Sequence, residues 1–248
     1  MPKLQPDRIK GLDLFIQACK ELVFPAHCLA CGRQLPCWKL PLFCHDCLAL
    51  ASFISSPVCV CCGIPFASGN DHLCGQCLAH TYSFSLARSA VLYRDPVAPL
   101  VSRLKFNKDL TGLSTLAWLA AASPGFRMLS PPDLIIPVPL HTERLRKRNY
   151  NQASLLAQAI FQEGRRKIDP ILLIRNRATI AQTELSGQQR RRNLSGAFSV
   201  KRPQMVEGKK ILLVDDVFTT GSTVNECART LYKNGAERVE AFTLARVV

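Results

Sequence analysis

The sequence predicts an α/β protein with a mainly parallel sheet, preceded by a small cysteine-rich region. Two observations support this prediction: ten of the twelve cysteines lie between positions 28 and 77, and short apolar runs alternate with amphipathic segments from about residue 83 onward. Short apolar runs are typical of strands buried on both faces, and their alternation with helices favours parallel pairing. With 248 residues, 48% of them hydrophobic, the chain can bury an ordinary core, which excludes a disordered tail.

The elements are expected in a regular order. An amphipathic helix is predicted over residues 7–22, where apolar residues recur at helical spacing. Strands are predicted near 86–93, 134–138, 171–175, 210–215 and 239–245. Helices are predicted near 96–106, 109–122, 150–163 and 222–234. Polar segments at 123–133 and 177–196 predict loops, and the second is long enough to form a functional flap. We therefore expect an N-terminal helix (1–24), a cysteine-rich domain (25–82) and an α/β domain (83–248).

The cysteine-rich region contains an internal repeat. Two cysteines separated by two residues occur four times, and the first two knuckles recur as the third and fourth. Each half has the spacing of a zinc ribbon, in which four thiolates surround one ion at about 2.3 Å. The repeat predicts two structural zinc ions held by Cys28, Cys31, Cys44, Cys47, Cys59, Cys62, Cys74 and Cys77. Cys62 is preferred to its neighbour Cys61 because it preserves the repeat. A cross-brace that joins the first knuckle to the third remains an alternative pairing.

The pattern of the N-terminus and the clustering of the cysteines indicate the cellular compartment of the protein. The first 22 residues carry charges throughout and lack the apolar stretch of a signal peptide. A reducing compartment is therefore expected, where clustered cysteines favour metal over disulfides. Residues 47–70 are uncharged, but their serines, prolines and cysteines suit a knuckle and linker better than a membrane helix. We expect a cytoplasmic protein with no membrane span.

Positive charge is concentrated in one part of the chain. The formal net charge is +14, and residues 140–210 carry 16 basic and 5 acidic residues, a balance of +11. Such a local field favours a polyanion or a phosphorylated small molecule as ligand.

The segment 211–223 predicts a sugar-phosphate site. An apolar strand ends in Asp215 and Asp216, and a turn rich in hydroxyls leads into a helix near Ser222. Free N–H groups at a helix start bind phosphate, whereas paired acids accept hydrogen bonds from ribose hydroxyls, directly or through Mg2+. The expected phosphoribosyl site therefore contains Asp215, Asp216, Thr219, Thr220, Gly221, Ser222 and Thr223.

This segment resembles the phosphoribosyl-pyrophosphate motif of type I phosphoribosyltransferases. Residues 28–248 as a whole resemble the ComF/GntX family, in which a double zinc ribbon precedes a phosphoribosyltransferase-like domain. The stretches 137–157 (PVPLHTERLRKRNYNQASLLA) and 175–198 are similar to two further family motifs. Asn149 and Tyr150 stand where the family usually has Gly-Phe. Asparagine is the residue that best replaces glycine in a left-handed turn.

The resemblance implies binding of phosphoribosyl pyrophosphate with Mg2+, a phosphoribosyltransferase-like activity, and a role in DNA uptake or in the use of imported DNA. Asp215, Asp216 and Arg148 are the expected catalytic residues. Residues expected at the pyrophosphate end or in the closing flap are Arg144, Arg148, Asn151, Gln152, Gln182 and Arg190. No recognisable acceptor-binding hood is present. The alternative is a non-catalytic protein that binds single-stranded DNA or senses phosphoribosyl pyrophosphate, with DNA-uptake proteins as further partners.

Overall fold

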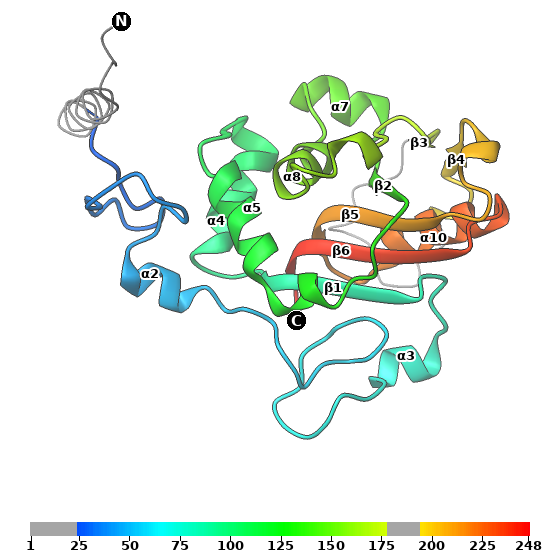
Figure 1. The fold of residues 1–248 in the computed structure, drawn as a ribbon, viewed down its shortest axis with the longest axis horizontal. Helices are drawn as coiled ribbons and strands as arrows, with labels where there is room; N and C mark the ends of the chain where they lie inside the picture. Colours follow the sequence, from blue (N-terminus) through cyan, green and yellow to red (C-terminus); the bar gives the residue numbers. More distant parts are fainter. Residues whose placement is uncertain (1–23, 178–193) are drawn as a thin grey trace, which may run out of the picture.

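The computed structural model describes residues 24–177 and 194–248. The predicted helix over 7–22, and Gln182 and Arg190 of the predicted flap, therefore lie outside the described residues. The central sheet has four parallel strands in the order β1 (Leu86–Leu92), β6 (Arg238–Arg246), β5 (Lys210–Phe218) and β2 (Leu134–Pro137). The predicted α/β class with a mainly parallel sheet is confirmed (Figure 1).

Helices cover both faces of this sheet. One face packs against α4 (Val97–Ser102), α5 (Leu113–Ala122) and α8 (Gln152–Ile160) through a buried apolar cluster. The other face packs against α10 (Ser222–Lys233). The remaining short helical segments are α6 (Pro124–Arg127), α7 (Thr142–Arg148), η2 (Arg165–Lys167) and η4 (Pro203–Met205). None of the helices in the described part of the chain combines the length and the apolar character that a membrane crossing requires.

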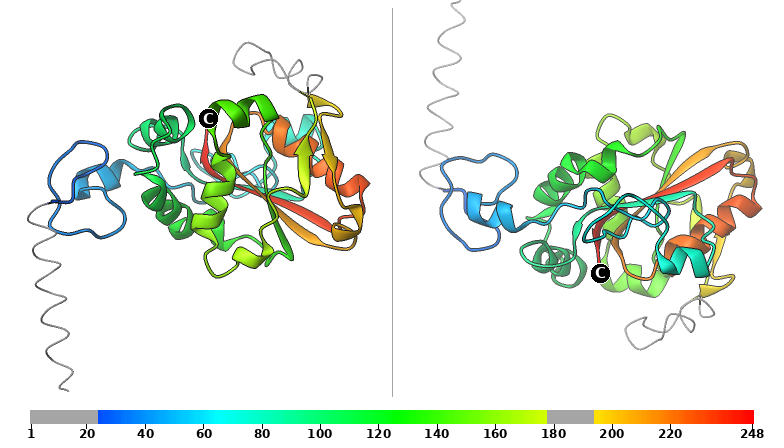
Figure 2. Two further views of the ribbon diagram at one scale, coloured as in Figure 1. Left: turned by 90° about the horizontal axis from the view of Figure 1, so that it is seen from above. Right: turned by 90° about the horizontal axis from the view of Figure 1, so that it is seen from below.

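The two cysteine modules join the core on different faces. The first contains α2 (His45–Leu50), and its buried cysteines pack with the cluster beneath α5. The second contains α3 (Gly75–Ala79), and its cysteines pack with the cluster beneath α10. Figures 1 and 2 show the first module (blue) beside α4 and the second (cyan) next to β1. Each module therefore shares a core with the sheet.

Three predicted elements need correction. The apolar run 171–175 does not join the parallel sheet, because β3 (Leu173–Arg175) pairs antiparallel with β4 (Phe198–Val200). The helix expected over 96–106 ends at Ser102 and continues as a π-helical turn, η1 (Arg103–Asn107). The helix expected from 109 begins only at Leu113, since the Asp109 carboxylate accepts hydrogen bonds from Thr111 and closes a turn there.

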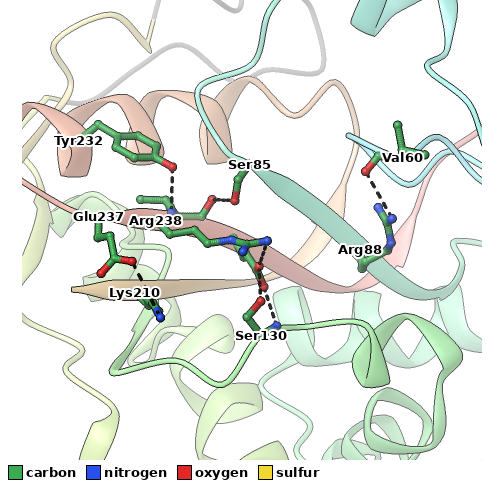
Figure 3. A network of polar contacts seen from close by, with 10 residues as sticks. Val60, Ser85, Arg88, Ser130, Lys210, Tyr232, Glu237 and Arg238 are labelled. Atoms are coloured by element: carbon green, nitrogen blue, oxygen red, sulfur yellow. Dashed lines mark hydrogen bonds and ion pairs between the residues drawn. The ribbon is translucent and has the colours of Figure 1, made fainter. Parts of the chain in front are cut away.

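A polar network closes the amino end of the sheet (Figure 3). Glu240 is buried in β6, where its carboxylate pairs with Arg238 at 2.8 Å and accepts two hydrogen bonds of 2.9 Å from Ser130. Lys210 and Glu237 add a looser pair at 3.9 Å. These charges pair with one another and fill the amino end of the sheet. The end that stays open is the opposite one, where the strands have their carboxyl ends.

Candidate phosphate and metal sites

A cleft of about 720 Å³ lies at the carboxyl ends of β2 and β5. This is the edge at which open parallel sheets bind ligands. Most of the residues that the sequence predicts for the phosphoribosyl and pyrophosphate sites line this one cleft: Arg144, Arg148, Gln152, Asp215, Asp216, Thr219, Gly221, Ser222 and Thr223.

The acidic pair belongs to β5 itself, which corrects the predicted strand end at 215. The strand continues to Phe218 because β6 runs beside it to its own last residue. Asp216 is buried, and its Oδ1 lies 3.0 Å from Nζ of Lys105. Its Oδ2 is also buried and has no hydrogen-bond partner in the described structure. Oδ1 of Asp216 is therefore held by Lys105, whereas its Oδ2 is available to a ligand.

Asp215, the other acid of the pair, is about half protonated near neutral pH. Loss of hydration, together with the nearby charge of Asp216, raises the pKa of Asp215 to about 7. Lys105 and Arg175 act in the opposite direction and lower it. A cationic ligand group or a divalent metal would favour the ionised form, so binding should draw a proton from this carboxyl.

The turn between β5 and α10 has the shape of an anion site. Gly221 is left-handed, with φ of 71°, and a Cβ placed there would lie only 2.5 Å from Cζ of Phe218. Ser222 then starts a twelve-residue helix whose first N–H groups point into the turn. The hydroxyls of Thr220 and Ser222 lie 2.8 Å apart. Backbone amides and hydroxyls therefore gather where the positive end of the helix dipole meets the cleft.

Cations come from α7 on the other side of the cleft. The Arg148 guanidinium donates to Oε1 of Gln152 at 2.9 Å and lies 5.3 Å from the ring centre of Phe106. Burial lowers the pKa of Arg148, and attraction by Asp216 partly offsets this effect. Asn149, which ends α7, has φ of 69°, so it adopts the left-handed backbone that the family's glycine would supply.

Two predicted site residues have structural contacts instead of lining the cleft. The Asn151 side chain caps α8 by accepting from the N–H of Ala153, and it donates to the carbonyl of Val138. The Thr220 hydroxyl bonds within the turn, and its carbonyl accepts from Tyr82. Both residues shape the walls of the cleft.

Sequence reasoning missed Lys105, Phe106 and Arg175, which also line the cleft. Lys105 and Phe106 lie on the π-helical turn η1, and Arg175 ends β3. The sequence marks Lys105 and Arg175 only as basic residues that follow an apolar stretch. That pattern is common on protein surfaces and does not identify a site.

The eight predicted cysteines form two tetrads, one from the first two knuckles and one from the last two. Within each tetrad all four Sγ atoms lie within 4.8 Å of one another, and the close pairs Cys31–Cys44, Cys59–Cys77 and Cys62–Cys74 are separated by 3.6–3.7 Å. A tetrahedral zinc–thiolate shell requires about 3.8 Å between sulfurs, so both tetrads fit structural zinc. This arrangement is the sequential pairing, not the cross-brace.

Family models match both halves of the chain. A double zinc ribbon domain matches residues 19–78, and a phosphoribosyl transferase domain matches residues 155–247. The fold and the two sites thus define a zinc-ribbon protein with a phosphoribosyltransferase domain.

Relatives that align with most of this chain show which family it belongs to. DNA utilization protein YhgH of Escherichia coli O6:H1 is 35% identical over 237 residues, covering 92% of this chain and all of the relative. Competence protein F of Haemophilus influenzae is 35% identical, covering 90% of this chain and 98% of the relative. Competence protein ComFC of Bacillus subtilis is 28% identical over 82% and 83% of the two chains. The chain belongs to the ComF/GntX family.

Distant resemblances to solved structures are also present. Glutamine phosphoribosylpyrophosphate amidotransferase from B. subtilis is 21% identical, with a TM-score of 0.33, over 53% of this chain and 26% of that one. A likeness at this level carries no argument about function.

Proposed function

We propose that the cleft binds phosphoribosyl pyrophosphate together with Mg2+ and that the protein transfers or cleaves the phosphoribosyl group. The observation that carries this proposal is the meeting of three groups in one cleft: the acidic pair of β5, the start of α10 and the cations of α7. Each group suits a different part of such a ligand. Their chemistry therefore indicates both the ligand and its orientation.

The 5-phosphate suits the turn 219–223, where amides and hydroxyls donate to anionic oxygens. The ribose hydroxyls suit Asp215 and Asp216, which accept hydrogen bonds. Arg144 and Arg148 suit the pyrophosphate, on which negative charge grows as the bond to C1 breaks. Preorganised cations at that end lower the barrier because they stabilise charge that is larger in the transition state than in the ground state.

The acidic pair also fits Mg2+, a cation that prefers carboxylate and phosphate oxygens. The free and buried Oδ2 of Asp216 is the atom that supports this assignment. When bound, the metal would neutralise charge on the pyrophosphate. Asp215 would give up its proton as the metal and ligand enter.

The proposal is tested by titrating phosphoribosyl pyrophosphate with Mg2+ into wild type and into the Asp215→Ala/Asp216→Ala variant. We expect wild type to bind and the variant to lose binding. Pyrophosphate release is then followed with candidate acceptors. Release that depends on both acids supports an enzyme, and absence of binding to wild type would refute the proposal.

A second candidate is a non-catalytic sensor that uses the same cleft. The observation in its favour is the 3.0 Å ion pair between Lys105 and Asp216, which already occupies one oxygen of the acidic pair. Binding that depends on the acids but yields no pyrophosphate with any acceptor would favour this candidate.

We further propose a cytoplasmic role in the use of imported DNA, since the named relatives are DNA utilization and competence proteins. Direct contact with single-stranded DNA would draw on the +11 balance of residues 140–210. The division into residues 1–24, 25–82 and 83–248 belongs to the same proposal, with the zinc modules as folding units. Limited proteolysis before and after zinc removal tests this division, because the first new cleavages should fall within the modules.

A further inference from the structure

One buried arginine lies between the second cysteine tetrad and the cleft. Arg246, the last residue of β6, is 3% exposed. Its Nη1 donates to the carbonyl oxygen of Cys62 at 2.6 Å, and its Nη2 lies 3.5 Å from the Sγ of the same residue. Cys62 is one of the four cysteines of that tetrad. The guanidinium therefore touches a zinc ligand directly.

The charge of Arg246 needs a partner that the polypeptide alone does not supply. Within the part of the chain that the structure describes, no carboxylate forms an ion pair with Arg246, and its Nε has no hydrogen-bond partner. Burying an unpaired cation is costly. Four thiolates around one zinc ion carry a net charge of about −2. The loaded tetrad is thus a natural counter-charge for this guanidinium.

The other side of Arg246 supports the phosphate turn. Its guanidinium carbon lies 4.4 Å from the ring centre of Phe218. That ring is buried and forms the floor under Gly221, where there is no room even for a Cβ. A shift of the ring would therefore move the backbone of the turn.

The last residue of the same module, Tyr82, and the residue that follows it, Ser83, also contact the turn and the start of α10. The Tyr82 hydroxyl donates to the carbonyl of Thr220 at 3.1 Å, and the Ser83 N–H donates to Oδ1 of Asn225 at 2.6 Å. Among the described residues, the first module instead packs on α5, where the Leu42 N–H donates to the Thr115 hydroxyl. Only the second module is therefore built against the turn in the described structure.

We propose that Arg246 is a positioning residue that couples zinc in the second tetrad to the shape of the turn between β5 and α10. The proposal rests on the proposed function only in that this turn binds the sugar phosphate. Zinc fixes the guanidinium, the guanidinium fixes Phe218, and Phe218 fixes the turn. The first tetrad has no part in this coupling.

The matched control is Arg88 on β1. Arg88 is equally buried, at 4% exposed, and donates to the carbonyl of Cys59 in the same module. It also donates to the carbonyl of Val60 (Figure 3). Neither arginine lines the cleft, but among the described residues it is Arg246, and not Arg88, whose guanidinium lies over the Phe218 ring. Arg88→Met and Arg246→Met should both weaken zinc binding, by about 10- to 100-fold as is typical for groups that support metal ligands. Only Arg246→Met should loosen the turn.

The experiment combines two readouts on the full-length protein. Zinc transfer to the chromogenic chelator 4-(2-pyridylazo)resorcinol measures how tightly each metal is held. Hydrogen–deuterium exchange of a peptide over 216–226 reports on the turn. In Arg246→Met we expect faster release of one of two zinc ions and faster exchange of the turn. In Arg88→Met we expect faster release with wild-type exchange.

Arg246→Lys keeps the charge but cannot lie flat on the Phe218 ring. We expect it to hold zinc better than Arg246→Met while the turn still exchanges faster than in wild type, and it carries the test alone if the methionine variant does not fold. Wild-type exchange of the turn in the folded Arg246 variants would overturn the proposal, as would equal exchange in the Arg88 and Arg246 methionine variants.

A further measurement, with phosphoribosyl pyrophosphate present, tests this inference separately from the proposed function. Coupling between binding sites is reciprocal, with typical factors of about 5- to 150-fold. Saturating phosphoribosyl pyrophosphate with Mg2+ should therefore slow release of the second zinc. If wild type binds no phosphoribosyl pyrophosphate but the exchange results hold, the proposed function fails and the coupling stands. If the ligand binds without slowing release, the coupling is refuted and the function stands.

Discussion

Replacing Asp215 by asparagine should stabilise the free protein at alkaline pH while removing ligand binding. The pKa of Asp215 is raised from 3.8 to about 7, by loss of hydration first and by the charge of Asp216 second. The folded state therefore holds this proton more tightly than the unfolded state. The free energy of unfolding then falls as pH rises from about 4 to about 7, and it stays low above that range. Asparagine has no such proton to lose.

The size of this change in stability is worked out only for pH values at which the zinc-binding thiolates stay ionised, because loss of zinc would unfold the protein for another reason. From about pH 5.5 to the pKa of about 7 is roughly 1.5 units, and each unit corresponds to about 1.4 kcal/mol. The stability advantage of Asp215→Asn over wild type should therefore grow by at most about 2 kcal/mol between pH 5.5 and pH 8. For a chain of this size that is a gain in Tm of about 4–8 °C.

Thermal unfolding at several pH values measures this difference, and Asp216→Asn is the matched control. Asp216 pairs with Lys105 at 3.0 Å. Its removal leaves a half-buried ammonium without its partner, and we expect this variant to be less stable than wild type at pH 8. A Tm difference between Asp215→Asn and wild type that does not change with pH would refute the raised pKa. Stabilisation with unchanged ligand binding would refute the role of Asp215 in the site.

Three further outcomes are expected. Gly221→Ala should lose ligand binding and destabilise the fold more than Gly208→Ala, since both positions have positive φ but only the first lacks room for a Cβ; equal Tm losses would contradict this. Elemental analysis should find two zinc ions per chain in wild type and in Cys61→Ser but one in Cys62→Ser, and a single ion in wild type would contradict the double site. The affinity for single-stranded DNA should fall steeply with salt in filter-binding assays, and a flat response would exclude a phosphate-tracking surface.

The sequence was most informative where the chemistry is local. The spacing of the knuckles predicted which cysteines gather, and Cys62 rather than Cys61 is the member of the second tetrad. The acids and the turn of the cleft could also be predicted, because strand, turn and helix are consecutive in the chain. Which knuckles share a metal depends on the path of the chain between them, so spacing alone left that pairing open.

Residues that reach the cleft from distant elements could not be predicted. Lys105 comes from a π-helical turn, and a period of 3.6 residues over 96–106 cannot show that the helix widens at Arg103. Arg175 ends an apolar run that reads as a buried parallel strand, although this run pairs antiparallel with β4 outside the main sheet. An apolar run shows that a strand is buried, but the partner of that strand is decided by tertiary packing.

The cleft exists because two neighbouring strands differ in length. β2 ends at Pro137, opposite Val214, and the next proline, Pro139, has no N–H with which to extend the ladder. β5 continues for four residues beyond Val214 with β6 as its only neighbour among the described strands. Asp215 and Asp216 stand at the first positions freed in this way. In the free protein the Asp216 N–H donates to Oδ1 of Asp215 at 2.9 Å. Because β2 stops here, the edge of β5 is open to a ligand. In the free protein the bond to Asp215 Oδ1 satisfies the Asp216 N–H, which would otherwise have no partner.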